Sequence, residues 1–296
     1  MTRFLPRGHL RISCHGGGQE GAAHADRRGA GGGIARALRA HVIVRLPGAR
    51  AAWYERDMTD DVYELTLSAP GRNALGTAHM ERLLGEVRAA AGRPLLLAGA
   101  NGVFSAGLNL KEVAALDLPG MRRFLGQLDD LIDALYDYPG PAVACVNGHA
   151  IAGGCVLALC CDLRIAGDDP TARIGLNEVA LGLEFPPKIL ALARDRVPRR
   201  MQERVLLEAA LFAPRTALEL GLVDEIAADP AAAARAALAR LAAAPRETYV
   251  ATKRTLRDGV LALSAAQRTA FEERILPAWC APATKERVRA ALARNR

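Results

Sequence analysis

Two glycine-containing loops are the first candidates for chemistry in this sequence of 296 residues. They are Phe104-Ser105-Ala106-Gly107-Leu108 and Ala152-Gly153-Gly154-Cys155, and each follows a predicted strand. Small residues let a ligand approach backbone N–H groups, and the second loop also opens a predicted helix, whose N-terminus favours negative charge. Two such N–H groups converging on one oxygen would form an oxyanion hole, in which each donor is worth roughly 2.7–4 kcal/mol. The spacing alone favours the alternative, that these glycines only permit tight turns and close helix packing.

One carboxylate stands out farther along the chain. Glu178 lies in the mostly apolar segment 174–182. Partial removal from water would raise its pKa toward the range of a working base. The residue pattern leaves open the alternative of an exposed loop glutamate.

Other reactive side chains give weaker signals. Ser105 misses the G-x-S-x-G nucleophile pattern because Val103 occupies the first glycine position, so we expect a loop hydroxyl. His149 follows the turn signal Asn147-Gly148 and could act as a base, but an isolated histidine is more often a satisfied polar residue. Neither a metal-ligand set nor a phosphate-binding glycine motif can be assembled.

The elements that must position these residues follow an α/β pattern. Strand-like runs alternate with amphipathic helices from Met58 onward, and beyond Pro186-Pro187 the chain is predicted to be almost entirely helical. Strands are predicted at 62–67, 95–98, 142–146 and 163–166, and helices at 77–91, 120–136 and from 153 to about 162.

The composition is that of a globular protein, with 51% hydrophobic and 24% charged residues. No apolar stretch is long enough for a membrane span. The net charge of +7 is concentrated in residues 1–57, which hold ten arginines and four acids, so that 29 basic and 28 acidic residues remain in the rest of the chain. A nucleic-acid partner is therefore not expected for the main body.

The first 57 residues are rich in glycine runs and lack helical or strand periodicity, which predicts a disordered basic leader. The leader is open to three interpretations: an organelle transit peptide, a basic arm, or an over-extended start upstream of Met58. We expect it to be dispensable for folding. Four of the six cysteines lie within residues 145–161 amid apolar neighbours, which indicates reduced thiols and a cytoplasmic location, or the mitochondrial matrix if the leader is a transit peptide.

Several motifs, in this order, resemble the crotonase (enoyl-CoA hydratase/isomerase) superfamily: Asn73-Ala74-Leu75, the run from Phe104 to Lys111, Asn147-Gly148, Ala152 to Cys155, and Cys161-Asp162. The resemblance spans about residues 60–227. It implies a β-β-α spiral core over 58–227 and a helical region over 228–296 that builds a trimer or a hexamer. It also implies an acyl-CoA thioester substrate, with no metal and no cofactor beyond the coenzyme A of the substrate.

The resemblance further implies roles for single residues. The backbone N–H groups of Ala106 and Gly153 would hold the thioester oxygen, and Glu178 would be the catalytic acid–base. Val156 stands where hydratases of this family carry a second glutamate, a pattern closer to the mitochondrial-type 3,2-trans-enoyl-CoA isomerase. The other positions expected to contact substrate are Ser105, Gly107, Leu108, Lys111, Gly154 and Val156.

The predicted activity is therefore isomerisation of 3-enoyl-CoA to 2-trans-enoyl-CoA in fatty-acid β-oxidation. Two alternatives remain open at this point. One is a hydratase or another thioester enzyme of the same fold, such as a thioesterase or a dehalogenase. The other is a non-catalytic binding protein whose basic arm binds RNA.

Overall fold

The computed structural model describes residues 61–294. The predictions for residues 1–57, including their disorder and dispensability, lie outside the described residues. The strands are β1 (Tyr63–Leu67), β2 (Leu95–Gly99), β3 (Ala142–Val146), β4 (Ala150–Ile151), β5 (Leu163–Gly167), β6 (Ile174–Gly175) and β7 (Glu225–Ala227).

Helices make up most of the remainder. The α-helices are α1 (Pro70–Asn73), α2 (Thr77–Ala89), α3 (Leu110–Ala115), α4 (Leu118–Tyr136), α5 (Gly153–Cys160), α6 (Pro187–Arg196), α7 (Gln202–Leu207), α8 (Pro214–Glu219), α9 (Pro230–Ala242), α10 (Arg246–Arg257), α11 (Ala265–Ala270), α12 (Leu276–Cys280) and α13 (Pro282–Arg294). Short turns of other helix types are η2 (Ala100–Gly102), η3 (Val179–Leu181), η4 (Arg199–Met201) and η5 (Phe271–Ile275).

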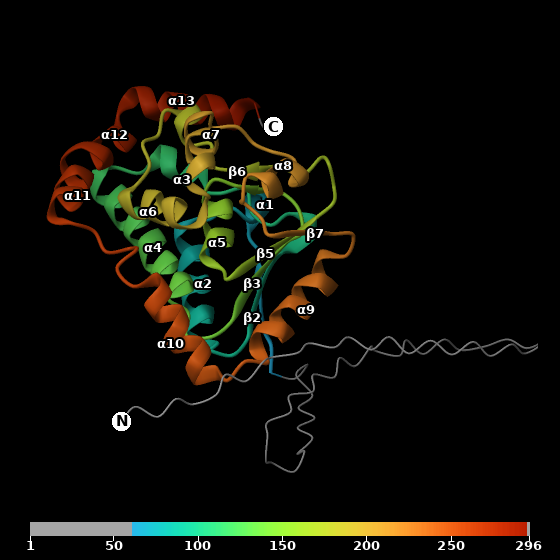
Figure 1. Cartoon of the computed structure of the whole chain (residues 1–296). Helices are drawn as coiled ribbons and strands as arrows, with labels where there is room; N and C mark the ends of the chain where they lie inside the picture. Colours follow the sequence, from blue (N-terminus) through green and yellow to red (C-terminus); the bar gives the residue numbers. More distant parts are fainter. Residues whose placement is uncertain (1–60, 295–296) are drawn as a thin grey trace, which may run out of the picture. The chain divides into compact units, whose positions relative to one another are not determined.

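The main sheet has five parallel strands in the order β1-β2-β3-β5-β7. Every residue of β3 is buried, as expected for a central parallel strand covered on both faces. One face packs against α9, where Val143, Cys145 and Ile165 meet Ala234 and its apolar neighbours. The helices α2, α4 and α5 lie on the other side of the sheet (Figure 1). The predicted α/β architecture is confirmed, with strand and helix bounds within a few residues of those expected.

A second, two-stranded sheet pairs β4 with β6 in parallel, with Ala150 opposite Ile174 and Ile151 opposite Gly175. Single bridges extend it to Ser105 on one side and Phe212 on the other. These strands have two residues each, too short for a periodic signal, and the sequence did not predict them. This small sheet is what brings the two glycine loops together.

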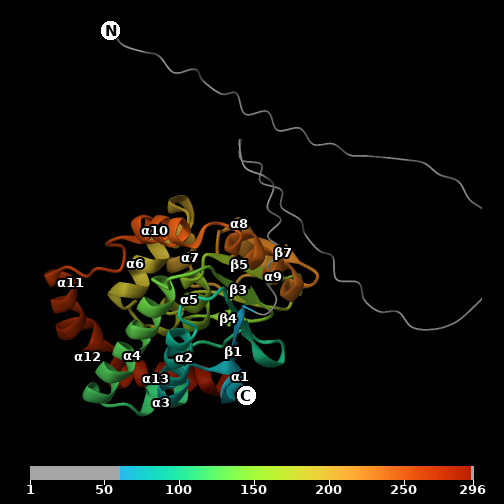
Figure 2. The ribbon, with the colours of Figure 1, turned by 90° about the horizontal axis from the view of Figure 1, so that it is seen from below.

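The C-terminal helices fold back onto the rest of the described chain. Trp279 is buried, and its Nε1 donates to the Glu184 carbonyl at 2.9 Å. Helix α12 packs on α4, and α13 lies beside α3 (Figure 2). The predicted helical C-terminal region is confirmed, while its part in trimer formation stays a prediction. No helix within residues 61–294 is long and apolar enough to cross a membrane.

Helix α10 attaches to the core through charge. Its buried residues are Lys253 and Arg257, which lie one turn apart. Both bind the Asp162 carboxylate, at 2.8 and 2.7 Å. The same carboxylate accepts hydrogen bonds from the Ala142 amide at 2.7 Å and the Tyr249 hydroxyl at 2.8 Å. One acid therefore joins α10 to the start of β3.

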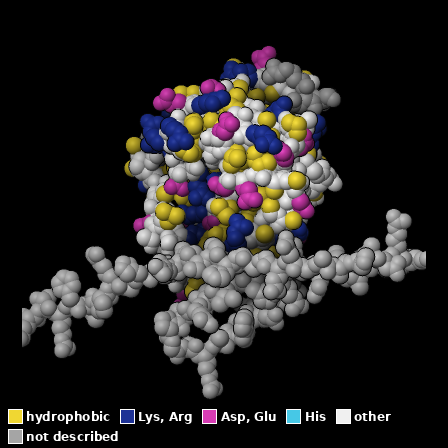
Figure 3. All heavy atoms as spheres, turned by 45° about the vertical axis from the view of Figure 1, so that its right-hand side comes forward, with side chains coloured by type: hydrophobic (Ala, Val, Ile, Leu, Met, Phe, Trp, Pro, Cys, Tyr) yellow, Lys and Arg dark blue, Asp and Glu magenta, His cyan; other side chains and the backbone are white. Residues whose placement is uncertain are grey.

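Charges of both signs are interspersed with apolar side chains on the face shown in Figure 3. This mixture agrees with the nearly balanced count of 29 basic and 28 acidic residues after residue 57. Apolar residues on the surface of a folded chain are normal when they are scattered.

Candidate active site

The two glycine loops predicted from the sequence lie against each other. The Ser105 amide donates to the His149 carbonyl at 2.9 Å, and the Ile151 amide donates to the Ser105 carbonyl at 3.0 Å. Gly107 has a φ of +88°, and a Cβ added to it would lie 2.6 Å from the Ile151 carbonyl oxygen and 3.3 Å from the Gly153 nitrogen. Only glycine fits a site that combines a positive φ with so close an approach.

Two backbone N–H groups meet at this contact. Gly153 is the first residue of α5, so its amide has no partner within the helix. A Cβ added to Gly153 would lie 3.5 Å from the Leu108 nitrogen. Within residues 61–294, neither the Leu108 nor the Gly153 amide donates to a protein acceptor.

The pairing of Leu108 with Leu75 explains why its amide is free. The Leu75 amide donates to the Gly107 carbonyl at 2.8 Å, and the Asn109 amide donates to the Leu75 carbonyl at 2.9 Å. In a parallel bridge of this kind, the N–H of the intervening residue points away from the paired segment. The Leu108 amide is thus directed to the side opposite Leu75.

Ala106 does not fit the role predicted for it. Its N–H donates to the Arg72 carbonyl at 3.0 Å and is not available to a ligand. Arg72 belongs to a left-handed turn, with φ values of 76° at Gly71, 62° at Arg72 and 59° at Asn73. The Asn73 side chain holds this turn by donating to the Val103 carbonyl at 2.6 Å. Leu108, predicted only as a substrate contact, replaces Ala106 as the donor that accompanies Gly153.

The start of α5 is strained. Ala152 has a φ of 48° and a ψ of −117°, a combination that disfavours residues with a Cβ. Its amide donates to the Gly175 carbonyl at 2.8 Å, so the small sheet holds the residue in place. Such strain persists where the surrounding structure fixes it, often at functional sites.

Glu178 is the only aspartate or glutamate in the described part of the chain that the fold buries, at 5% exposure. Its Oε2 atom is buried without a hydrogen-bond partner there. Burial raises the pKa of Glu178 to about 7, because the charged form loses its water shell. The sequence-based expectation of a desolvated carboxyl is confirmed, and the alternative of an exposed loop glutamate is wrong.

Strand pairing brings Glu178 toward the loops. Gly175, the last residue of β6, pairs with Ile151, the last residue of β4. Glu178 lies three residues beyond Gly175, and Gly153 lies two residues beyond Ile151, so both residues leave the small sheet at the same end. Glu178 lies close enough to Cys155 on α5 for its charge to act on that thiol. Burial raises the pKa of Cys155 to about 12, so the thiol is neutral and Glu178 is the group that can exchange a proton near pH 7.

The remaining predicted residues differ in their environments. Ser105 is fully buried; its hydroxyl donates to the Asn73 carbonyl at 2.8 Å and accepts from the Gly107 amide at 3.2 Å, so it shapes the loop from behind. Gly154 is a packing residue, because a Cβ there would lie 2.5 Å from the Ser105 carbonyl oxygen. Val156 is 0% exposed within the main core, and Lys111 is exposed on α3.

His149, the other possible base, has a structural partner. Its Nδ1 accepts a hydrogen bond from the Arg173 amide at 3.0 Å. That bond helps to fasten the loop before β4 to the segment before β6. His149 is therefore accounted for without a catalytic role.

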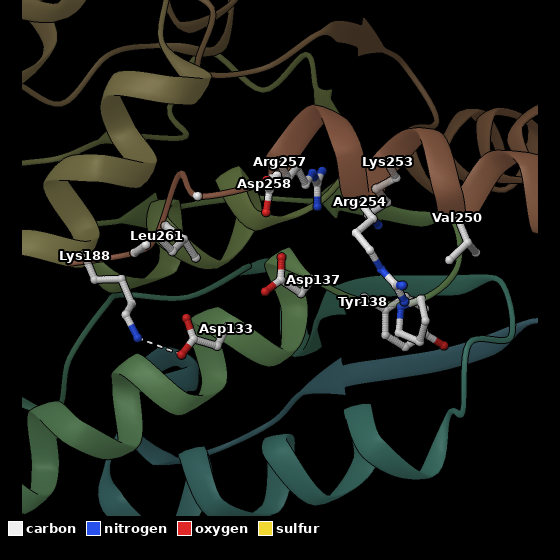
Figure 4. Close-up of a pocket in the computed structure, with 13 residues that line it drawn as sticks. Asp133, Asp137, Tyr138, Lys188, Val250, Lys253, Arg254, Arg257, Asp258 and Leu261 are labelled. Atoms are coloured by element: carbon white, nitrogen blue, oxygen red, sulfur yellow. Dashed lines mark hydrogen bonds and ion pairs between the residues drawn. The ribbon is translucent and has the colours of Figure 1, made fainter. Parts of the chain in front are cut away.

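A cavity of about 550 Å³ lies elsewhere, between the end of α4 and α10 (Figure 4). Lys188 pairs with Asp133 across it at 2.7 Å, and Arg254 extends from α10 toward Tyr138. None of the residues predicted for chemistry lines it. We assign the chemistry to Glu178 and the two glycine loops, because Glu178 is a buried acid without a partner on Oε2 and the glycine loops hold the two free amides.

Residues 57–290 match the family described as Enoyl-CoA hydratase/isomerase. The mitochondrial enoyl-CoA delta isomerase 1 of Mus musculus is 35% identical over 158 residues, which is 53% of this chain and 55% of that protein. The chain thus spans just over half the length of that relative. The probable enoyl-CoA hydratase echA17 of Mycolicibacterium paratuberculosis is 33% identical over 220 residues, covering 71% of this chain and 83% of the relative.

Solved structures give the same result for the fold. The crystal structure of human mitochondrial delta3-delta2-enoyl-CoA isomerase superimposes with a TM-score of 0.75 at 28% identity, over 81% of this chain and 96% of that one. The family match begins before β1 and runs into α13, through nearly every described element. This chain therefore belongs to the enoyl-CoA hydratase/isomerase family, the crotonases.

Proposed function

We propose that the protein is an isomerase that moves the double bond of a 3-enoyl-CoA into conjugation, giving 2-trans-enoyl-CoA. The observation that carries this proposal is the combination of a single buried carboxyl group, Glu178, which follows β6, with two free amides, of which that of Gly153 follows the paired strand β4. Hydratases of this family use two glutamates, and here the second position is Val156, packed in the core at 0% exposure. One proton shuttle suffices for isomerisation but leaves water addition without its second acid–base group.

In the proposed reaction, the Glu178 carboxylate accepts a proton from C2 of the substrate. The electron pair of the C2–H bond delocalises into a dienolate, whose negative charge rests on the thioester oxygen. The Leu108 and Gly153 amides donate hydrogen bonds to that oxygen. The Glu178 carboxylic acid then returns the proton at C4, so the proton count is unchanged and the double bond has moved from C3–C4 to C2–C3.

The similarity to proteins named as isomerases, at 35% identity in sequence and a TM-score of 0.75 in structure, supports this assignment. We also propose a place in fatty-acid β-oxidation, because the proposed substrate is an unsaturated acyl-CoA thioester. The relative named as a probable hydratase makes water addition the competing activity.

Two parallel assays separate these activities. The purified protein is incubated with a 3-enoyl-CoA, and conjugation is followed by ultraviolet absorbance; it is also incubated with a 2-enoyl-CoA, and loss of conjugation reports hydration. We expect turnover in the first assay and little or none in the second. Hydration faster than isomerisation would refute the proposal.

The pH dependence gives a further prediction. Glu178 must be deprotonated to accept the C2 proton, and burial raises its pKa to about 7. We therefore expect kcat/KM to rise with pH up to about 7 and to level off above that value. The measurement is a rate profile from about pH 5 to pH 9 at constant ionic strength. A profile that is flat down to about pH 5 would mean that a carboxyl group of ordinary pKa is the base.

A further inference from the structure

Helix α13 connects the two walls of the candidate site. One wall is α3, which begins two residues after Leu108, and the other is η3, which directly follows Glu178. The Lys285 ammonium donates to the Leu116 carbonyl just beyond α3, at 2.6 Å. Arg287 contacts η3 on the other side. The next residue, Val288, is 1% exposed and also anchors the helix.

The contact of Arg287 with η3 is close. Its Nε donates to the Leu181 carbonyl at 3.2 Å, and its Nη2 donates to the hydroxyl of buried Thr284 at 3.1 Å. Gly182 has a φ of +68°, and a Cβ added to it would lie 2.4 Å from Arg287 Nε. The guanidinium group thus lies directly against the Gly182 backbone.

The turn that Arg287 contacts is closed by backbone hydrogen bonds to Glu178. The Leu181 and Leu183 amides both donate to the Glu178 carbonyl at 3.0 Å. Arg287 and Glu178 are therefore joined through one residue: Arg287 donates to the carbonyl of Leu181, and the amide of Leu181 donates to Glu178.

We propose that Arg287 is a positioning residue for Glu178, and that α13 keeps the Glu178 loop closed against water. This inference rests on the proposed function only for the catalytic role of Glu178. The position of its side chain does not depend on that role. Arg287 touches neither the carboxyl group nor the two free amides, so it acts through η3.

We expect the loss of Arg287 to change the pKa of Glu178 by changing the burial of its carboxyl group, and not by removing a positive charge. Burial is the main cause of the raised pKa of Glu178, and the guanidinium group is not among its causes. The titratable neighbour on α5 is Cys155, whose thiol is neutral near pH 7, and η3 carries only apolar side chains. Loosening η3 would admit water to Oε2 and lower the pKa of Glu178 from about 7 toward its usual value of 4.5.

The test compares Arg287→Met, which keeps the aliphatic stem and removes the donors, with Arg289→Met, a second exposed arginine of the same helix. We expect Arg287→Met to lower kcat about tenfold with KM nearly unchanged, because a small misplacement of a catalytic group costs one to two orders of magnitude. The acid limb of its pH profile should move below pH 7. Arg287→Lys, which restores one donor, should recover part of both effects, and Arg289→Met should show neither.

A titration without substrate distinguishes this inference from the proposed function. The Glu178 carboxyl resonance is assigned by ¹³C NMR from its absence in Glu178→Gln, and its pKa is measured in each arginine variant whose thermal melting shows a folded state. A lower pKa in Arg287→Met alone supports the positioning role even if the catalytic role of Glu178 were wrong. Equal Glu178 pKa values in Arg287→Met, Arg289→Met and the parent protein would overturn it.

Discussion

Glu178→Gln is expected to lower the kcat of isomerisation by roughly 10²–10⁴-fold, the usual contribution of a general acid–base group. The amide keeps the size of the side chain but cannot accept the C2 proton. Binding of the CoA ester should change little, because the proposed oxygen contacts are backbone amides of other residues. Steady-state kinetics and calorimetric titration with a non-reactive acyl-CoA measure the two quantities separately.

The matched control is Glu184→Gln, six residues farther along. Glu184 pairs with Arg274 on the surface and should be neutral for activity. Full activity of Glu178→Gln would show that Glu178 is not the base, and the catalytic assignment would fail.

The same substitution should stabilise the folded state at alkaline pH. Glu178 has a pKa of about 7 when folded and about 4.5 when unfolded, so the native state binds a proton that the unfolded state releases between these values. Stability therefore falls as the pH rises from 4.5 to 7 and is constant above that range. Glutamine does not titrate and removes this loss of stability, which amounts to at most about 3 kcal/mol in the free energy of unfolding. The melting temperature of Glu178→Gln should exceed that of the parent protein more at pH 8 than at pH 5.

Asp162→Asn should have the largest effect on stability. The carboxylate, a tenth exposed, binds Lys253 and Arg257, and both cations are more than nine-tenths buried. Asparagine removes the charged group that both cations contact, and breaking a buried ion pair from one side costs about 3–5 kcal/mol. We expect a loss of that size in the free energy of unfolding, measured by urea denaturation at neutral pH.

Asp168→Asn is the control for this prediction. Asp168 pairs with Arg215 at 2.7 Å, but both side chains are exposed, at 43% and 76%. Exposed pairs of this kind contribute under about 1 kcal/mol. If both variants lost the same small amount, Asp162 would not be what holds α10 to the core.

The regular elements could be predicted from the sequence because their signals are local. Buried strands such as 142–146 are apolar at every position, and helix 118–136 carries apolar residues at helical spacing. The short strands β4, β6 and β7 have two or three residues and carry no periodic signal. They form because larger elements place their backbones side by side.

The sequence by itself determined the α/β core, the helical C-terminal region and the two loops with Glu178 as the places where chemistry can occur. Which amides are free was decided only by the tertiary structure: the Arg72 carbonyl occupies the Ala106 amide, while the bridge to Leu75 turns the Leu108 amide away. The burial of Glu178 and the contact of Arg287 with its loop also arise from folding, since 109 positions separate these two residues in the sequence. Residue types show which groups can react, but exposure and hydrogen-bond occupancy depend on segments that meet only in three dimensions.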